Sequence, residues 1–157
     1  MLSDAEIGRL AARLEPYLPG EGPVRLSGFN RIHGGASRQT FRFDAERGDQ
    51  RKGLILRRDP VASLIDTERA LEFAAYQTFA GTRVPAPRPI LLEEGTETLG
   101  APFFVMERSD GGVAGSPFID GIFGPKVEAL TRQFFGYLGQ IAATPPEGTP
   151  LAAVTDT

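Results

Sequence analysis

The chain contains no cysteine and a single histidine, His33, and these absences exclude several kinds of chemistry. Without cysteine there is no disulfide, no thiol nucleophile and no thiolate metal site, which fits a reducing compartment. One histidine does not make a zinc site, which takes several histidine or cysteine ligands. We therefore predict no metal centre within the chain and expect the protein to be cytoplasmic.

Long apolar runs and a strong net charge are also missing. No segment approaches the roughly 20 apolar residues that a membrane span needs, and the N-terminus lacks the pattern of a signal peptide. The net charge is −3 and the arginines are scattered, so nothing indicates nucleic acid as a partner. With 157 residues, 41% of them hydrophobic and 24% charged, the chain fits a soluble globular domain.

The residues that are present predict an α+β fold with helices at both ends. Ser3 and Glu6 form a capping box that opens an N-terminal helix, in which one stripe is apolar. Its members are Ile7, Leu10, Ala11 and Leu14. The strands are predicted over 24–32, 40–45, 54–57, 88–94 and 102–108, with a polar turn over 46–53. They would make a five-stranded, mainly antiparallel sheet with one helix inserted after the third strand, over about 67–80.

Prolines and phenylalanines mark the second half of the chain. Pro85, Pro87 and Pro89 favour an edge position for the fourth strand, because proline donates nothing to a ladder. A C-terminal helix is predicted from Pro125 or Lys126 to about residue 143. Its apolar residues at helical spacing are Val127, Leu130, Phe134, Leu138 and Ile141. Its aromatic residues are interpreted as core rather than as a cofactor site. They are Phe134, Phe135 and Tyr137.

A glycine turn between the first two strands is the first candidate binding element. Gly34 and Gly35 let the backbone approach a ligand closely, so that the N–H groups from there to Arg38 could point at a polyphosphate. Ala36 is small, and Ser37 could add a hydroxyl donor. A glycine pair alone more often only connects two strands, so its interpretation depends on the neighbouring segments of the chain.

The third strand ends in a cation. Its two-residue period places Ile55 and Arg57 on one face, opposite Leu54, Leu56 and Arg58. Arg57 would then point to the side of the glycine turn and could contact phosphate through its planar fork. The plainer alternative is that Arg57 and Arg58 are the solvated end of a strand.

The inserted helix supplies a carboxylate for that cation. Asp66 or Thr67 could cap the helix, and its predicted apolar stripe begins at Leu71. Glu68 and Glu72 lie one turn apart, and either could reach the strand arginine. Glu72, in the middle of the helix, is the chosen partner.

Taken in order, these segments resemble the amino-terminal lobe of the aminoglycoside phosphotransferase family, whose fold is kinase-like. The segments are GGASRQTFRF, LILRRDP, ERALEFAAYQTFAGTRVPAPRPI and LGAPFFVMERSDGG. The resemblance runs from about Val24 to Gly112, with a weaker echo over 127–143. It is nearest to the branch associated with acyl-CoA dehydrogenases, in which arginine commonly replaces the strand lysine.

The resemblance implies transfer of phosphate from ATP or GTP, with Mg²⁺, to a hydroxyl of a small molecule. It assigns the phosphate loop to the glycine turn up to Arg38, the phosphate-binding cation to Arg57 and its helix partner to Glu72. Met106 falls at the gatekeeper position, beside Ile55 in the nucleotide cleft. Glu107 and Ser109 match the connecting segment, whose backbone would bind the adenine edge.

The chain departs from this family where catalysis would take place. Kinases of this type need a loop of the form H-G-D-x-x-x-x-N and a later metal-binding aspartate. His33 precedes every motif and no asparagine follows Asn30, so no catalytic residue is assigned. We expect a helical extension over 1–22, a nucleotide-binding lobe over 23–112 and, over 113–157, a loop and helix leading toward a lobe that is absent. The chain alone is expected to be inactive and to be part of a longer kinase.

Two questions stay open at this level. The chain could instead be a non-catalytic nucleotide-binding or interaction module that uses the same pocket. The acceptor, and the choice between ATP and GTP, are not encoded in these motifs. If a second lobe is missing, apolar surface should be exposed near residues 118–123 and the Phe134 helix, which predicts a homodimer.

Overall fold

The computed structural model describes residues 2–32, 38–59, 69–111, 121 and 123–155. It confirms an α+β fold built on one five-stranded sheet in the order β1-β2-β3-β5-β4, with antiparallel pairing throughout. The strands are β1 (Arg25–Ile32), β2 (Gln39–Arg47), β3 (Gln50–Arg58), β4 (Pro89–Glu93) and β5 (Phe103–Glu107). The α-helices are α1 (Asp4–Leu14), α2 (Arg69–Phe79), α3 (Val127–Ala143) and α4 (Ala152–Thr155), and two short 3₁₀ turns, η1 (Glu15–Tyr17) and η2 (Gly124–Lys126), precede β1 and α3.

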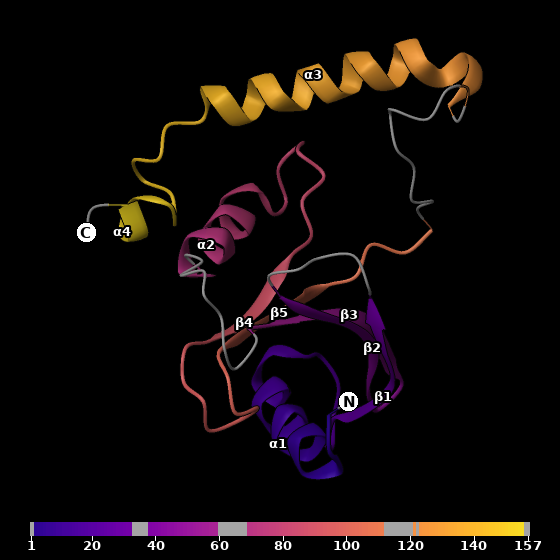
Figure 1. Cartoon of the computed structure of the whole chain (residues 1–157), viewed down its shortest axis with the longest axis vertical. Helices are drawn as coiled ribbons and strands as arrows, with labels where there is room; N and C mark the ends of the chain where they lie inside the picture. The colour runs from indigo at the N-terminus through magenta and orange to yellow at the C-terminus, as the bar shows by residue number, and fades with distance from the viewer. Residues whose placement is uncertain (1, 33–37, 60–68, 112–120, 122, 156–157) are drawn as a thin grey trace.

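Helices α1 and α2 lie against opposite faces of the sheet (Figure 1). The predicted capping box of α1 is present: Ser3 Oγ accepts from the Glu6 amide, and the Glu6 carboxylate accepts from the Ser3 amide. Leu10 and Leu14 are fully buried in the core of this face. The N-terminal helix is therefore part of the sheet's own hydrophobic core.

Side chains of the central strands alternate between the two faces as their two-residue period predicts. The core on the α1 side takes its largest side chains from β2, β3 and β5: Phe41, Phe43, Leu54, Leu56, Phe103 and Val105. Arg58 belongs to this side as well, since it forms an ion pair with Glu6 of α1. Ile55 and Arg57 consequently lie on the other face, as expected.

Helix α2 packs on that other face. Phe73 meets Phe104 of β5 edge to face, with ring centroids 6.0 Å apart, and Tyr76 lies 6.2 Å from the same ring. The buried residues of α2 are Phe73 and Ala74, so the predicted stripe beginning at Leu71 was misplaced by part of a turn. The orientation of the helix is set by Phe104, which lies far away along the chain. Its predicted start at residue 67 lies outside the described residues.

The turn between β2 and β3 and the first residue of β4 can be compared with the predicted strand boundaries. The polar turn expected over 46–53 is shorter, because β2 continues to Arg47 and β3 already begins at Gln50. Gly48 makes this possible with a φ of +56°, a conformation that favours glycine. Pro89 opens β4 at the edge of the sheet, which confirms the edge position predicted from the prolines.

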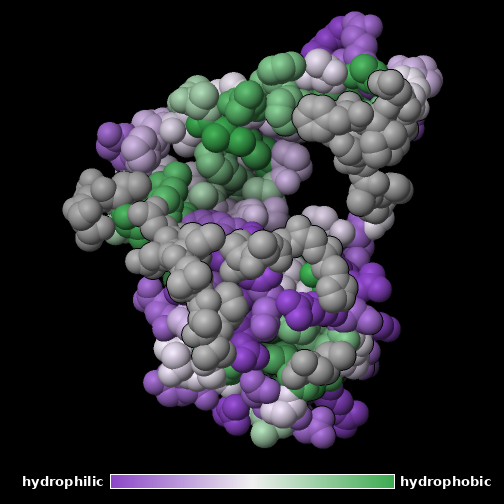
Figure 2. Space-filling model, viewed as in Figure 1, coloured by the Kyte–Doolittle hydropathy of each residue, from purple (hydrophilic) through white to green (hydrophobic). Residues whose placement is uncertain are grey.

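The prediction of a buried C-terminal helix was right in its boundaries and wrong in its burial. Helix α3 runs from Val127 to Ala143 but has no buried residue. Phe134 and Phe135 are each 62% exposed, and Tyr137 is only partly covered. The helix crosses one end of the molecule, away from the sheet, with apolar side chains along it (Figures 1 and 2). A helical apolar period shows which face of α3 is apolar, but not whether another element covers it.

Candidate functional site

The structure brings Arg57 and Glu72 together. Arg57 Nη1 donates to Glu72 Oε1, which joins the end of β3 to the first turn of α2. The guanidinium also lies over the ring of Phe104, with Cζ 5.6 Å from the ring centroid. The predicted ion pair is thus confirmed as geometry, and the alternative of a solvated strand end is wrong for both arginines, since Arg58 pairs with Glu6.

Glu72 holds a second arginine that the sequence motifs did not pair with it. Arg38 Nη1 donates to Glu72 Oε2, so each carboxylate oxygen accepts from a different guanidinium. The Arg38 side chain is 5% exposed, compared with 27% for Arg57. Thr40 lies opposite Arg57 in the β2·β3 ladder, and Arg38 belongs to the same face as Thr40. This strand register, which the sequence does not show, is what places Arg38 beside Glu72.

Asp59 and Arg69 extend the pair into a chain of alternating charges. Asp59 Oδ1 lies 3.2 Å from Arg38 Nε, and Arg69 Nη2 donates to Asp59 Oδ2. Within the described ranges, neither Arg38 Nε nor Asp59 Oδ1 has a hydrogen-bond partner, so the contact between them is purely electrostatic. The order is Arg57, Glu72, Arg38, Asp59, Arg69. Three arginines face two carboxylates, which leaves a surplus positive charge, and Arg57 is the most exposed of these cations.

A cleft of about 720 Å³ opens on the same face of β3, at Ile55. Its walls come from β1, β2 and the segment after β5. The lining residues are Gly28, Asn30, Ile32, Arg42, Asp44, Ile55, Arg108, Ser109, Asp110 and Gly111. Of the predicted site residues, Ile55 and Ser109 line this cleft, whereas Arg57 lies two residues farther along β3 on the same face.

The other predicted residues have different places. Met106 lies opposite Ile55 in the β3·β5 ladder and is partly buried. The Glu107 side chain forms an ion pair with Lys52 at 2.5 Å and borders a different cavity. Gly34, Gly35, Ala36 and Ser37 lie outside the described residues.

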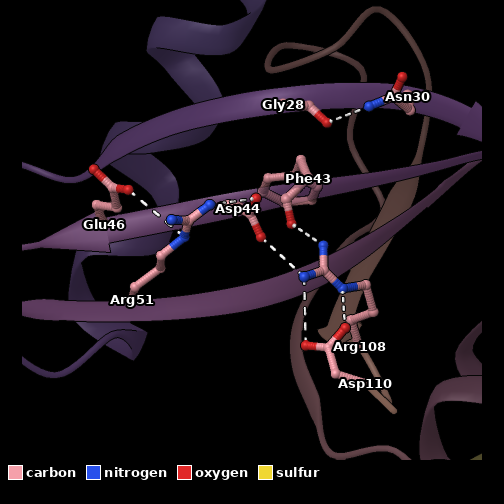
Figure 3. A network of polar contacts seen from close by, with 8 residues as sticks. All are labelled: Gly28, Asn30, Phe43, Asp44, Glu46, Arg51, Arg108 and Asp110. Atoms are coloured by element: carbon pink, nitrogen blue, oxygen red, sulfur yellow. Dashed lines mark hydrogen bonds and ion pairs between the residues drawn. The ribbon is translucent and has the colours of Figure 1, made fainter. Parts of the chain in front are cut away.

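Arg108 forms the wall of the cleft and was not predicted as a site residue. Its guanidinium lies 3.0 Å from Asp44 Oδ1 and 2.6 Å from Asp110 Oδ1, and it donates to the Phe43 carbonyl (Figure 3). The hydrogen bond to Asp110 raises the pKa of the Arg108 guanidinium above its ordinary value. A hydrogen bond from Arg51, together with Arg108, holds the pKa of the Asp44 carboxyl below its usual range. Arg108 thereby ties the segment after β5 to β2.

Neither a metal-binding cluster nor a membrane-spanning helix is found in the described part of the chain. No group of three or more histidine, aspartate or glutamate side chains in these ranges could hold a metal ion. None of the helices that the structure describes is long and apolar enough to cross a membrane.

Comparison with known proteins gives a consistent result. Residues 28–157 match the model of the phosphotransferase enzyme family. The mouse (Mus musculus) acyl-CoA dehydrogenase family member 10 is 28% identical over 146 residues, which are 88% of this chain and 13% of the mouse protein. The crystal structure of a candidate aminoglycoside phosphotransferase from Ralstonia eutropha shares the fold with a TM-score of 0.63 and 21% identity, over 94% of this chain and 39% of that one. The chain thus spans a minor part of each relative.

Proposed function

Since the chain belongs to the phosphotransferase enzyme family, we propose that it is the nucleotide-binding lobe of a kinase that phosphorylates a hydroxyl of a small molecule. The observation that carries this proposal is the ion pair between Arg57 and Glu72 on the cleft face of the sheet. A cation at the end of this strand, paired with a carboxylate of the following helix, is the arrangement with which kinases hold phosphate. Here arginine stands in the place of the usual lysine.

The nucleotide base occupies the cleft beside Ile55. Ser109 lines this cleft, and its amide would bind the base together with the Glu107 carbonyl. The amides of Glu107 and Arg108 already donate to the carbonyls of Arg88 and Gly53. Met106, which lies opposite Ile55 in the β3·β5 ladder, would be the gatekeeper residue. Binding of this kind uses backbone groups at a fixed edge of the sheet, which does not by itself distinguish ATP from GTP.

The phosphates extend from the cleft toward Arg57. The amides from Gly34 to Arg38 and the Ser37 hydroxyl would cradle them, and the surplus positive charge of the arginine chain would offset theirs. The described residues do not fit Mg²⁺, because they contain no carboxylate cluster for it. The carboxylates that hold the metal with the nucleotide would come from another lobe.

Phosphate transfer requires catalytic groups that this sequence does not contain. A base to take the acceptor's proton would come from a histidine–aspartate loop in a second lobe, together with the acceptor site. The lobe over 23–112 then binds nucleotide, with 1–22 as its helical extension, and the segment 113–157 leads to the second lobe. Such a kinase acts in the cytoplasm, where ATP and GTP are available, and has no role with nucleic acid.

A second copy of the chain is the proposed partner of α3. Six large apolar side chains of this helix are between 39% and 62% exposed: Val127, Leu130, Phe134, Phe135, Leu138 and Ile141. Surfaces of this kind are usually covered, so a homodimer is expected when no second lobe covers α3.

The alternative is a nucleotide-binding or interaction module without catalysis, which would use the same pocket. The two candidates differ in a measurable way. We expect this chain to bind ATP or GTP with a dissociation constant in the millimolar range, about −4 kcal/mol, since half of the site is missing. Arg57→Ala should weaken binding, while Arg58→Gln, on the other face of the same strand, should not.

Transfer of phosphate to a hydroxyl is then tested in the longer protein of which this chain would form a part. With a panel of small hydroxyl compounds, that protein should consume ATP, and Arg57→Ala should reduce the rate. Binding that Arg57→Ala leaves unchanged, with no transfer to any compound, would favour the non-catalytic module.

A further inference from the structure

Glu72 accepts hydrogen bonds from two arginines, so Arg57 binds only one of its carboxylate oxygens. An arginine facing a lone carboxylate commonly takes both oxygens with two parallel N–H donors. Here Arg38 occupies Oε2, and Arg57 is left with Oε1 through one nitrogen. Among the described residues this is the only ion pair of Arg57. Its second terminal nitrogen is therefore not held by Glu72.

We propose that Arg38 is a positioning residue. By occupying Glu72 Oε2, it leaves one terminal nitrogen of the Arg57 guanidinium available to bind a nucleotide phosphate. The inference rests on the proposed function and deepens it. The Arg38 side chain is too buried to meet a ligand, at 5% exposure, and it pairs with Asp59 as well as with Glu72. Arg57 is 27% exposed and remains on the cleft face.

The need for such a residue follows from the arginine at position 57. A lysine ammonium is a compact point charge whose three donors can be shared between a carboxylate and a phosphate. A guanidinium is planar, and one carboxylate can engage two of its donors at once. When Arg38 is lost, Glu72 becomes free to bind Arg57 bidentately, and the donor that would meet phosphate is withdrawn.

The arrangement also fixes the carboxylate. Arg38 is attached to the start of β2 and, through Asp59, to Arg69 at the beginning of α2. Glu72 is thus held by Arg38 at one carboxylate oxygen and by Arg57 at the other. Arg38 is the last residue of the proposed phosphate loop, and its side chain is paired with Glu72 of α2.

The test measures ATP and adenosine binding to this chain by NMR titration, with single variants and one double variant. Arg38→Gln should raise the dissociation constant for ATP about tenfold, the size of one lost charge-assisted hydrogen bond. Adenosine, which has no phosphate, should bind as before. In an Arg57→Lys background, Arg38→Gln should change the ATP affinity by less than about twofold, since lysine is not captured by both oxygens. Arg58→Gln, which removes one partly buried charge from β3, is the matched control.

The outcomes distinguish the positioning role of Arg38 from the proposed function of nucleotide binding. Equal losses of ATP and adenosine affinity, or the same loss in both backgrounds, would show that Arg38 only maintains the fold, and would overturn the positioning role. If Arg57→Ala weakens ATP binding and Arg38→Gln does not, the positioning role fails and the proposed function stands. If Arg57→Ala has no effect, the proposed function itself fails.

A conservative variant covers the case in which Arg38→Gln does not fold, as judged by thermal unfolding. Arg38→Lys keeps a cation at Glu72 Oε2 and should retain ATP affinity within about twofold of the original chain. A folded Arg38→Lys protein that loses ATP binding while keeping adenosine binding would contradict the idea that occupancy of this oxygen is what matters.

Discussion

The guanidinium of Arg108 lies directly over Gly53, where a Cβ atom would be 2.6 Å from Arg108 Cζ. Gly53 stands opposite Asp44 in the β2·β3 ladder, and its carbonyl accepts from the Arg108 amide. The missing side chain therefore lets an arginine from the segment after β5 cross β3 and reach Asp44 and the Phe43 carbonyl on β2. The wall of the cleft depends on this crossing.

Gly53→Ala tests the crossing through stability. The added methyl should displace the Arg108 guanidinium and destabilise the chain by about 1 kcal/mol, the size of a partly exposed charged contact. In an Arg108→Ala background the same change should instead stabilise it by roughly 0.5 kcal/mol, because alanine is favoured over glycine in a strand. Urea unfolding of the four proteins gives both values. The same effect of Gly53→Ala in both backgrounds would contradict the crossing.

Leu10→Ala tests whether α1 is integral to the sheet. Leu10 is fully buried although it precedes the family match, which begins at residue 28. The truncation should lower the free energy of unfolding by about 3 kcal/mol, as for other large core truncations. Arg13→Ala, at a half-exposed ion pair with Glu93, should cost less than about 1 kcal/mol. Similar small costs for both variants would show that α1 is only loosely attached.

Stability should fall in acid because of two carboxyls. Hydrogen bonds from the Ser3 backbone and side chain lower the pKa of Glu6, and the hydrogen bond from Arg51 lowers that of Asp44. Each group contributes stability that is complete above its ordinary pKa of about 4 and is lost as the pH falls through the lower folded value. Unfolding by urea between neutral pH and about pH 3 should show this loss. Asp44→Asn should flatten the profile, and an unchanged profile would exclude Asp44 as a source.

The exposed face of α3 predicts association that depends on concentration. Sedimentation velocity should show dimers of the chain, and Phe134→Asp should shift the population toward monomer, because it places a charge in the apolar surface. Arg132→Gln, on the highly exposed polar side of α3, should leave association unchanged. A monomer at high concentration in the unaltered chain would rule out this surface as a contact between copies.

The sequence was sufficient for those features that depend on local patterns. The two-residue period of β3 predicted that Ile55 and Arg57 share a face, and the order of segments predicted Glu72 as the partner. The contacts of Arg38 with Glu72 and with Asp59 were not predicted. They depend on the register between β2 and β3 and on the position of α2. Arg108 was missed for a similar reason, since its role requires Gly53 to lie beneath it. The interpretation of Phe134 as core was wrong, because no local pattern reports what another element covers. The exposure expected for the Phe134 helix without a second lobe is confirmed.

The central claim is that nucleotide binds on the Ile55 face of the sheet, with its phosphates toward Arg57. The most direct measurement is an ATP titration of ¹⁵N-labelled chain followed by amide chemical shifts. We expect shifts at Ile55, Arg57 and Ser109 that saturate together, and a loss of the Arg57 response when adenosine replaces ATP. Shifts confined to the opposite cavity, around Tyr17 and Lys52, would contradict it.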